Sequence, residues 1–465
     1  MTGTVFWICF ISVAMAFFLL ARYVARIDIM QLSAPSLVLV SLFMFGFLGY
    51  AQAYYELDAG GDFRGMVDRH LLDRMFIYAS YSIIMVVLGY ALARRALPAW
   101  LRPPAGERFR NISESRGEFL MIIALTVISV LVLLRVLYLA PVIAIFEAFK
   151  DNALEARLAA RSEMFYDFPG KLWWYSLFYS SFLSVCCWAA FARVLLKFDW
   201  KRVAVFIAIF IPAFFAAIMT TAKAPGAWLL IGLVLTAIVV KGAGRVSIKA
   251  VLSALLAGML FLGAAFYLVG VPDYTKKDLA SRTSKTLGIL VSDIYSRAIG
   301  AEVMTFYYYM EIFPNKVDYL HGRSLPNPRN IFPFEPYSLS REVMKIVHPG
   351  MEEKTGRIGS APTAYWGELY ANFGPLGVFL PFSLLVGMAV YGLGGLYTHC
   401  ARNPLGVGCY VWLLLHLKDL PVTSMFQVFV NIDLFFVTLV ALAAWYVGRR
   451  GPHLVEALPF GFREK

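Results

Sequence analysis

The sequence predicts an all-α polytopic membrane protein with about eleven transmembrane helices. Hydrophobic residues occupy 60% of the 465 positions and charged residues only 15%, so that the mean hydropathy reaches +0.68. Apolar runs recur along most of the chain, and one long polar segment interrupts them. A soluble domain of this length has far fewer apolar residues. The composition therefore excludes a soluble enzyme or a soluble binding protein.

The apolar runs divide the chain into three parts. Runs that approach the roughly 20 residues of a spanning helix lie at 5–21, 34–54, 75–93, 119–140, 172–194, 203–219, 227–240, 250–270, 373–397 and 428–447, with a shorter one at 406–424. Residues 1–270 hold the first eight predicted helices, 271–372 form a large polar loop, and 373–465 hold the last three helices and a short tail. The run at 406–424 is interrupted by Lys418, Asp419 and Pro421, which is typical of a span with a broken end or of a re-entrant segment.

Charge is distributed unevenly between alternate loops. The loops at 22–33, 93–118, 197–202, 241–249, 398–405 and 448–465 contain 19 Lys and Arg against 7 Asp and Glu, and the difference, 19 − 7 = 12, equals the net charge of +12. Basic loops stay in the cytoplasm. We therefore predict that the C-terminus is cytoplasmic and the N-terminus lies on the outer side. The orientation of the helices in the membrane explains the excess of positive charge, so we expect no nucleic-acid partner.

Two segments on the predicted outer side are too long for simple connections. The polar loop 271–372 has roughly 100 residues and is rich in aromatic residues, which favours a functional segment over a disordered one. The loop 141–171 contains a stretch, 145–164, with helical spacing of its apolar residues. We expect this stretch to lie on the membrane surface as an interfacial helix.

Cations inside predicted helices cluster towards the outer side. Arg135, Lys223 and Lys418 map to the outer third, whereas Arg193 maps to an inner end. Snorkelling explains each cation taken alone. Their coincidence beside the long loop favours a cationic basin for a lipid-linked phosphate or diphosphate. The candidate diphosphate-binding residues are Arg135, Arg157, Arg161, Lys223, Arg323, Arg329, Arg357 and Lys418.

The same side carries candidate bases and candidate sugar-binding residues. Glu368 is the first choice for a general base, because residues 362–377 run from the loop into the next helix, and His321 and Asp433 are further candidates. Aromatic rings offer flat apolar faces for stacking on sugars, although an aromatic belt or ordinary packing is the favoured explanation for any one of them taken alone. The candidate sugar-binding residues are Tyr308, Tyr365, Trp366, Tyr370 and Asn372.

Several kinds of site leave no trace in the sequence. The five cysteines all lie in or beside apolar runs, and the chain contains no clustered carboxylates, P-loop or metalloprotease motif. We therefore expect no metal and no cofactor.

The segment Gly367-Glu-Leu-Tyr-Ala-Asn-Phe-Gly-Pro-Leu-Gly377 resembles a stretch of the bacterial oligosaccharide repeat unit polymerases, the Wzy-like O-antigen polymerases. In that family a similar stretch follows a large periplasmic loop and leads into a helix. The whole layout of this chain is similar too, including a basic residue, Lys223, in a Thr-rich outer turn. Lys223 replaces the usual arginine, and the Arg-x10-Gly loop motif is missing after Arg157 and Arg161.

The resemblance implies a metal-independent glycosyltransferase with a GT-C-like helical fold. Such an enzyme lies in the bacterial inner membrane, with residues 271–372 as a large periplasmic loop between the eighth and ninth helices. It transfers a growing glycan from undecaprenyl diphosphate to the next lipid-linked repeat unit. Cations would stabilise the diphosphate leaving group, and a base would assist the acceptor hydroxyl. Membrane lipids, a flippase and a chain-length regulator are the implied partners.

Two other functions fit the same sequence. An O-antigen ligase would share the fold and donor but use the lipid A-core as acceptor. A transporter of lipid-linked oligosaccharides would move the same substrate without chemistry, although transporters usually carry internal repeats and midplane charges, which we do not find here.

Overall fold

The computed structural model describes residues 3–58, 66, 68–103, 109, 112–150, 154–170, 172–247, 300–327, 332–350 and 359–454. In these ranges every regular element is a helix, apart from an isolated bridge between Gln31 and Arg245. The predicted all-α class is therefore confirmed for the described residues. The loop and helix assignments for residues 248–299 lie outside them.

Eight helices of the described ranges are long and apolar enough to span a membrane. They are α1 with η1 (Gly3–Leu19, Leu20–Val24), α2 with η2 and α3 (Ala34–Ser41, Leu42–Phe47, Gly49–Asp58), α4 (Arg69–Ala96), α5 (Arg116–Leu139), α8 with η4 and α9 (Leu172–Ser176, Leu177–Phe182, Leu183–Leu196), α10 (Trp200–Ile218), α11 (Lys223–Lys241), and α20 with α21 (Met425–Phe429, Ile432–Leu454). Each coincides with a predicted apolar run. The predicted run at 250–270 lies outside the described residues.

Other described helices are shorter or bent. They are η3 (Ala99–Leu101), α6 (Ala144–Lys150), α7 (Leu154–Tyr166), α14 (Ala301–Ile312), α15 (Leu339–Val347), α17 (Tyr365–Phe379), α18 (Phe382–Cys400) and α19 (Pro404–Leu417). The stretch predicted as one interfacial helix thus contains α6 and α7, which expose Phe146, Phe149 and Tyr166. Exposed aromatic side chains are typical of helices that lie on a membrane surface.

The ninth predicted span begins later than its apolar run indicates. Helix α17 meets α18 at an angle of 96°, so only α18 continues the direction of a span. Within α17, Gly374 has φ 65° and ψ −155°, and Pro375 follows it. A Cβ atom at Gly374 would lie 2.7 Å from the Tyr319 ring. Glycine is needed at this position both for its backbone conformation and for space.

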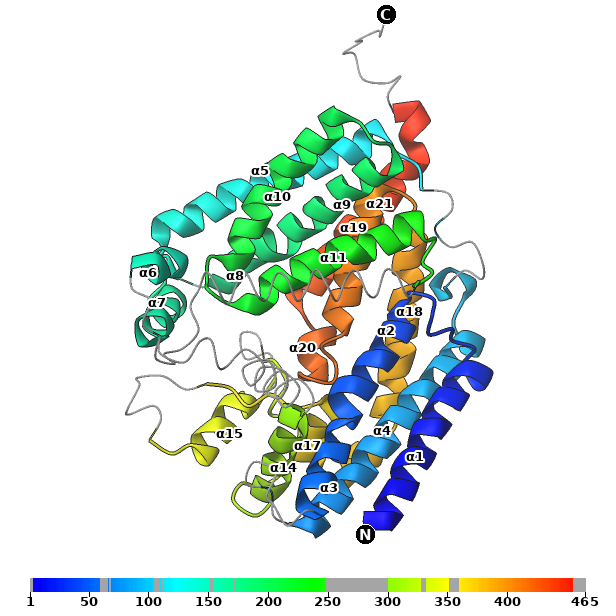
Figure 1. Ribbon diagram of the computed structural model, residues 1–465, viewed down its shortest axis with the longest axis vertical. Helices are drawn as coiled ribbons and strands as arrows, with labels where there is room; N and C mark the ends of the chain where they lie inside the picture. Colours follow the sequence, from blue (N-terminus) through cyan, green and yellow to red (C-terminus); the bar gives the residue numbers. More distant parts are fainter. Residues whose placement is uncertain are drawn as a thin grey trace, which may run out of the picture.

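The basic loops meet at one end of the helix bundle, which we call the basic end. Gln31 pairs with Arg245, Ser113 donates its amide proton to the Arg402 carbonyl, and Arg202 pairs with Glu114. The start of α1 lies at the opposite end of the molecule in Figure 1, and α21 ends near the basic end. The loops that were grouped by their excess of basic residues therefore lie at the same end of the bundle in the structure. The side of the membrane that each end faces stays a prediction.

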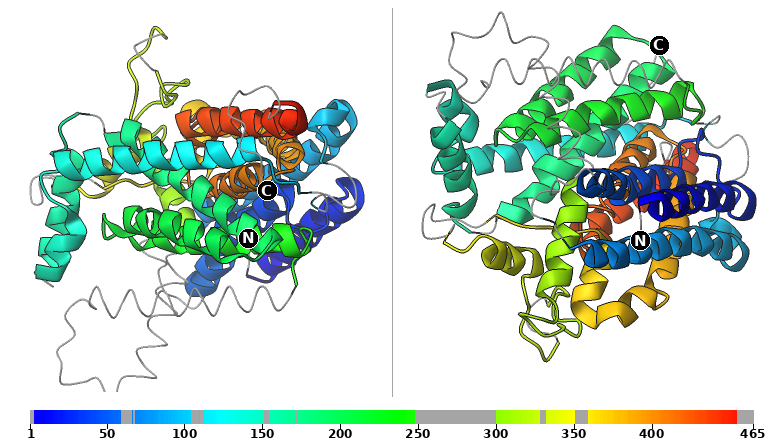
Figure 2. Two further views of the ribbon diagram at one scale, coloured as in Figure 1. Left: turned by 90° about the horizontal axis from the view of Figure 1, so that it is seen from above. Right: turned by 60° about the horizontal axis from the view of Figure 1, so that its bottom comes forward.

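Helix α19 occupies the centre of the bundle. Helices α1 to α4 and α18 pack together on one side of it, and α5, α9, α10 and α11 on the other (Figure 1, Figure 2). All residues of α19 except His416 are buried. Small residues allow such close packing: Gly89 of α4 and Gly387 of α18 bring the two backbones together, and a Cβ on either would lie 2.2 Å from a carbonyl oxygen of the other helix. The C-terminal end of this central helix carries the residues of the candidate site.

Candidate functional site

A cavity of about 380 Å³ opens at the end of the bundle opposite the basic end, and we call it the Lys418 pocket. Its walls come from α7, η4, α9, α10, α11, α21 and the end of α19. Its lining combines serines and threonine (Ser176, Ser180, Ser181, Ser184, Thr220), three tryptophans (Trp188, Trp228, Trp412), small alanines of α10, and His416, Lys418, Asp419 and Asp433. Ser180 and Ser181 lie on the π-helical segment η4, and π-helical turns are frequent at functional sites.

Lys418 is held in the wall of this pocket, where α19 ends. Its ammonium group donates to Asp419 at 2.5 Å and lies 3.9 Å from the centre of the Trp228 ring. The side chain is only 11% exposed, whereas that of Asp419 is 43% exposed. A lysine ammonium has three N–H donors, so the pairing with Asp419 leaves donors for an anionic ligand.

His416 and Asp433 face the pocket from neighbouring helices. The His416 ring stacks on Trp412, with centroids 4.6 Å apart, and its Nε2 lies 2.8 Å from the Val428 carbonyl oxygen. Ser181 donates to Asp433 at 2.7 Å. The described lining therefore contains one lysine, one histidine and two carboxylates. The described lining of the pocket thus has mixed charge, and the cationic basin stays a prediction, because several of its cations fall outside the described residues.

Glu368 lies in a separate hydrogen-bonded cluster beside the pocket. Its carboxyl group accepts from Ser424 at 2.6 Å and from Ser324 at 3.0 Å, and Asn372 in turn donates to Ser324 at 2.7 Å. The Glu368 residue is 3% exposed. Ser424 belongs to the segment that follows Lys418, so this cluster is joined to the pocket wall through one short stretch of chain. Glu368 itself does not line the pocket.

The other predicted catalytic and diphosphate-binding residues lie away from the pocket or are not described. His321 is exposed in a turn with φ 49°. Arg323 lies exposed over the Tyr337 ring, Arg161 is exposed on α7, and Arg135 is exposed beside Tyr138. The side chains of Arg157 and Lys223, and the whole of Arg329 and Arg357, fall outside the described residues. Among the predicted residues, the pocket thus brings together Lys418 and Asp433.

The predicted sugar-binding residues lie in the core instead of the pocket. Tyr365, Trp366, Tyr370 and Asn372 are buried, and Tyr308 is half-buried. The hydroxyl groups of Tyr365 and Tyr370 donate to backbone carbonyls of Ser82 and Phe313. Protein atoms cover these rings, so their faces are not available to a sugar in this arrangement. Three tryptophans line the pocket, although Trp188 and Trp412 are themselves only 3% and 7% exposed, and an apolar helix gives no sign in sequence of the direction of each ring.

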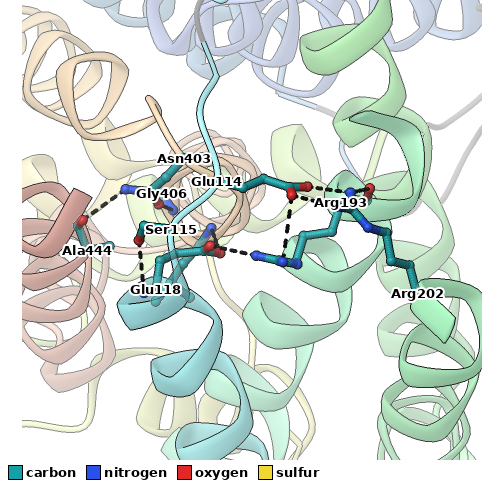
Figure 3. A network of polar contacts seen from close by, with 9 residues as sticks. Glu114, Ser115, Glu118, Arg193, Arg202, Asn403, Gly406 and Ala444 are labelled. Carbon is teal, nitrogen blue, oxygen red and sulfur yellow. Dashed lines mark hydrogen bonds and ion pairs between the residues drawn. The ribbon is translucent and has the colours of Figure 1, made fainter. Parts of the chain in front are cut away.

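The basic end of α19 is anchored by a buried ion-pair network (Figure 3). Glu118 accepts from the backbone amide of Leu405 at 3.2 Å, which satisfies one of the free amides at the start of α19. Arg193 donates to Glu118 at 2.9 Å, and Arg202 donates to Glu114 at 2.6 Å. The structure therefore corrects the snorkelling reading of Arg193. This network fixes the helix whose other end carries His416 and Lys418.

Glu302 on α14 provides a pH-sensitive contribution to stability outside the spanning helices. Its Oε2 atom is buried and has no hydrogen-bond partner among the described residues. Burial raises the pKa of Glu302 to about 8, from 4.5. Between these values the unfolded chain binds fewer protons at this site than the folded one, so the stability falls as pH rises, by at most about 1.4 kcal/mol per pH unit. We expect Glu302→Gln to flatten the dependence of melting temperature on pH between 5 and 8, and an unchanged slope would contradict this assignment.

Within the described ranges no group of three or more His, Cys, Asp or Glu side chains is placed to hold a metal ion. Comparisons with protein-family models, curated proteins and solved structures found no match to this chain. The Lys418 pocket and its neighbours are therefore the features of the molecule that bear on its function.

Proposed function

We propose that this protein is a glycosyltransferase with a GT-C-like fold that polymerises undecaprenyl-diphosphate-linked oligosaccharide repeat units on the periplasmic side of the bacterial inner membrane. The observation that carries the proposal is the Lys418 pocket. It combines tryptophan rings, hydroxyl groups, two carboxylates and a buried ammonium group within a bundle of spanning helices. These groups match a substrate that has sugar rings, hydroxyl groups, a diphosphate and a lipid tail.

Each part of such a substrate has a complementary group on the described surface. Sugar rings stack on aromatic faces, and their hydroxyl groups donate to carboxylates. The Lys418 ammonium supplies positive charge where the diphosphate leaves. Lys223, a candidate diphosphate-binding residue from the sequence, starts α11 two residues before Pro225, which lines the pocket. The exposed apolar faces of α5 and α10 provide contact with lipid.

The test is reconstitution of the purified full-length protein in liposomes. The substrate is the lipid-linked repeat unit extracted from the source bacterium after deletion of this gene. We expect a ladder of products that differ by one repeat unit, formed in the presence of a chelator. A chain-length regulator added to the liposomes is expected to narrow the ladder, and a flippase is expected to supply the substrate in the cell.

Other outcomes identify the alternative functions. Transfer of a single glycan to added lipid A-core, with no ladder, would identify a ligase. Movement of the lipid-linked unit across the bilayer without lengthening would identify a transporter. Either result would replace the polymerase proposal.

A further inference from the structure

We propose that His416 is the general base of the glycosyl transfer, a role that rests on the function proposed above. The structure places it in the wall of the Lys418 pocket, at the last turn of α19, where it is the one residue of that helix that is not buried.

The hydrogen bond of His416 decides which of its ring nitrogens can act. Nε2 lies 2.8 Å from the Val428 carbonyl oxygen, and a carbonyl oxygen only accepts. Nε2 must therefore carry the proton of the neutral ring. Nδ1 then holds the free lone pair, and it has no partner among the described residues. In this arrangement the hydrogen bond of one ring nitrogen fixes the tautomer, and the other nitrogen is free to act as a base.

The surroundings of the ring hold it in place and set the charges that face it. Stacking on Trp412 fixes the ring plane, because the centroids lie 4.6 Å apart at an interplanar angle of 12°. The charged groups around the ring are Lys418 and Asp419 on the following turn and Asp433 on α21. The two carboxylates favour the imidazolium that forms when the base takes a proton, whereas burial and Lys418 oppose it.

The other carboxylates beside the pocket are less suited to this role. Asp419 is occupied by Lys418, Asp433 already accepts from Ser181, and Glu368 is sealed in its own cluster. In the proposed step the acceptor hydroxyl oxygen forms a bond to the anomeric carbon of the donor, and its proton passes to Nδ1 of His416. The bond from that carbon to the diphosphate oxygen breaks, and the diphosphate leaves with the electron pair beside Lys418. Water then removes the proton from the imidazolium.

The test compares His416→Gln with wild type on the extracted lipid-linked repeat unit. A glutamine amide can still donate to Val428 but cannot accept a proton, so packing is retained and the base is lost. We expect the rate of elongation to fall about 100-fold or more, with donor binding kept. The matched control is His399→Gln: His399 also bonds a backbone carbonyl, that of Arg102, but lies at the basic end, and the rate should stay near that of wild type.

The pH dependence separates a base from a packing residue. The wild-type rate should fall at acid pH, where the ring is protonated, and the residual activity of His416→Gln should lack this decline. Asp433→Asn keeps the ring but removes a stabilising charge, so the acid decline should move to lower pH. A His416→Gln protein with the wild-type rate, or an Asp433→Asn profile with an unmoved decline, would overturn the role of His416 while polymerisation by the wild type stands. A wild-type protein that lengthens no glycan would overturn the proposed function itself.

Discussion

Replacing Lys418 by methionine is expected to lower the rate of glycan elongation by about 10²–10³-fold, the loss typical when one electrostatic partner of a developing negative charge is removed. Methionine keeps the apolar stem that packs near Trp228 but removes the ammonium group. Its partner Asp419 is 43% exposed, so the carboxylate remains hydrated and the variant should fold. Because the diphosphate gains charge as it leaves, the loss should appear mainly in kcat and not in KM.

The measurement is the initial rate of elongation in liposomes at several concentrations of the lipid-linked repeat unit. Lys316→Met is the matched control, because Lys316 also pairs with a carboxylate, Glu311, but is 54% exposed and does not line the pocket. Its rate should equal that of wild type. If Lys418→Met still made long chains at the wild-type rate, the proposal that the diphosphate binds in this pocket would be contradicted.

Replacing Arg193 by methionine is expected to destabilise the protein by about 3–5 kcal/mol, the usual cost of removing one partner from a buried ion pair. Glu118 is 0% exposed, and Arg193 is only 15% exposed. Without Arg193 the Glu118 carboxylate is left buried beside the start of α19 (Figure 3). The melting temperature in detergent should therefore fall markedly, and elongation should fall with it as α19 loses its anchor.

A double variant separates the buried charge from lost packing. In Arg193→Met with Glu118→Gln the unpaired charge is removed, and the glutamine oxygen can still accept from Leu405, so most of the melting temperature should return. Lys150→Met breaks the exposed pair with Glu147, in which the lysine is 70% exposed, and should leave the melting temperature unchanged. If Arg193→Met had the same melting temperature as wild type, the network would not anchor α19.

The helices were largely predictable because a membrane-spanning helix requires a long apolar run, which is visible in the sequence. The eight long apolar helices in the described part of the chain all fall on predicted runs. Contacts such as that of Ser113 with Arg402 join loops that were grouped by their charge. The bend between α17 and α18 was not predictable from hydropathy. The kink inside α17 was not predictable either, because Gly374 lies against the ring of Tyr319, which is distant in sequence.

The candidate site was predictable only in part. Lys418 and Asp433 stood out because charges are rare in apolar runs, and the structure brings both to one pocket. Tyr365, Trp366 and Tyr370 stood out as aromatic residues in a polar segment, yet they are buried. Trp228 and Trp412 were not predicted as ligands, since sequence does not show which face of a helix meets a cavity.

The sequence by itself determined the class of the protein, the position of its helices and the grouping of its loops, because these depend on local hydropathy and on charge along the chain. Only the tertiary structure decided which polar side chains share a cavity. That choice depends on how α9, α10, α11 and α21 pack around the end of α19, and therefore on contacts between residues far apart in sequence. For the same reason Glu368, the first candidate from sequence, lies beside the pocket, and His416 lies in it.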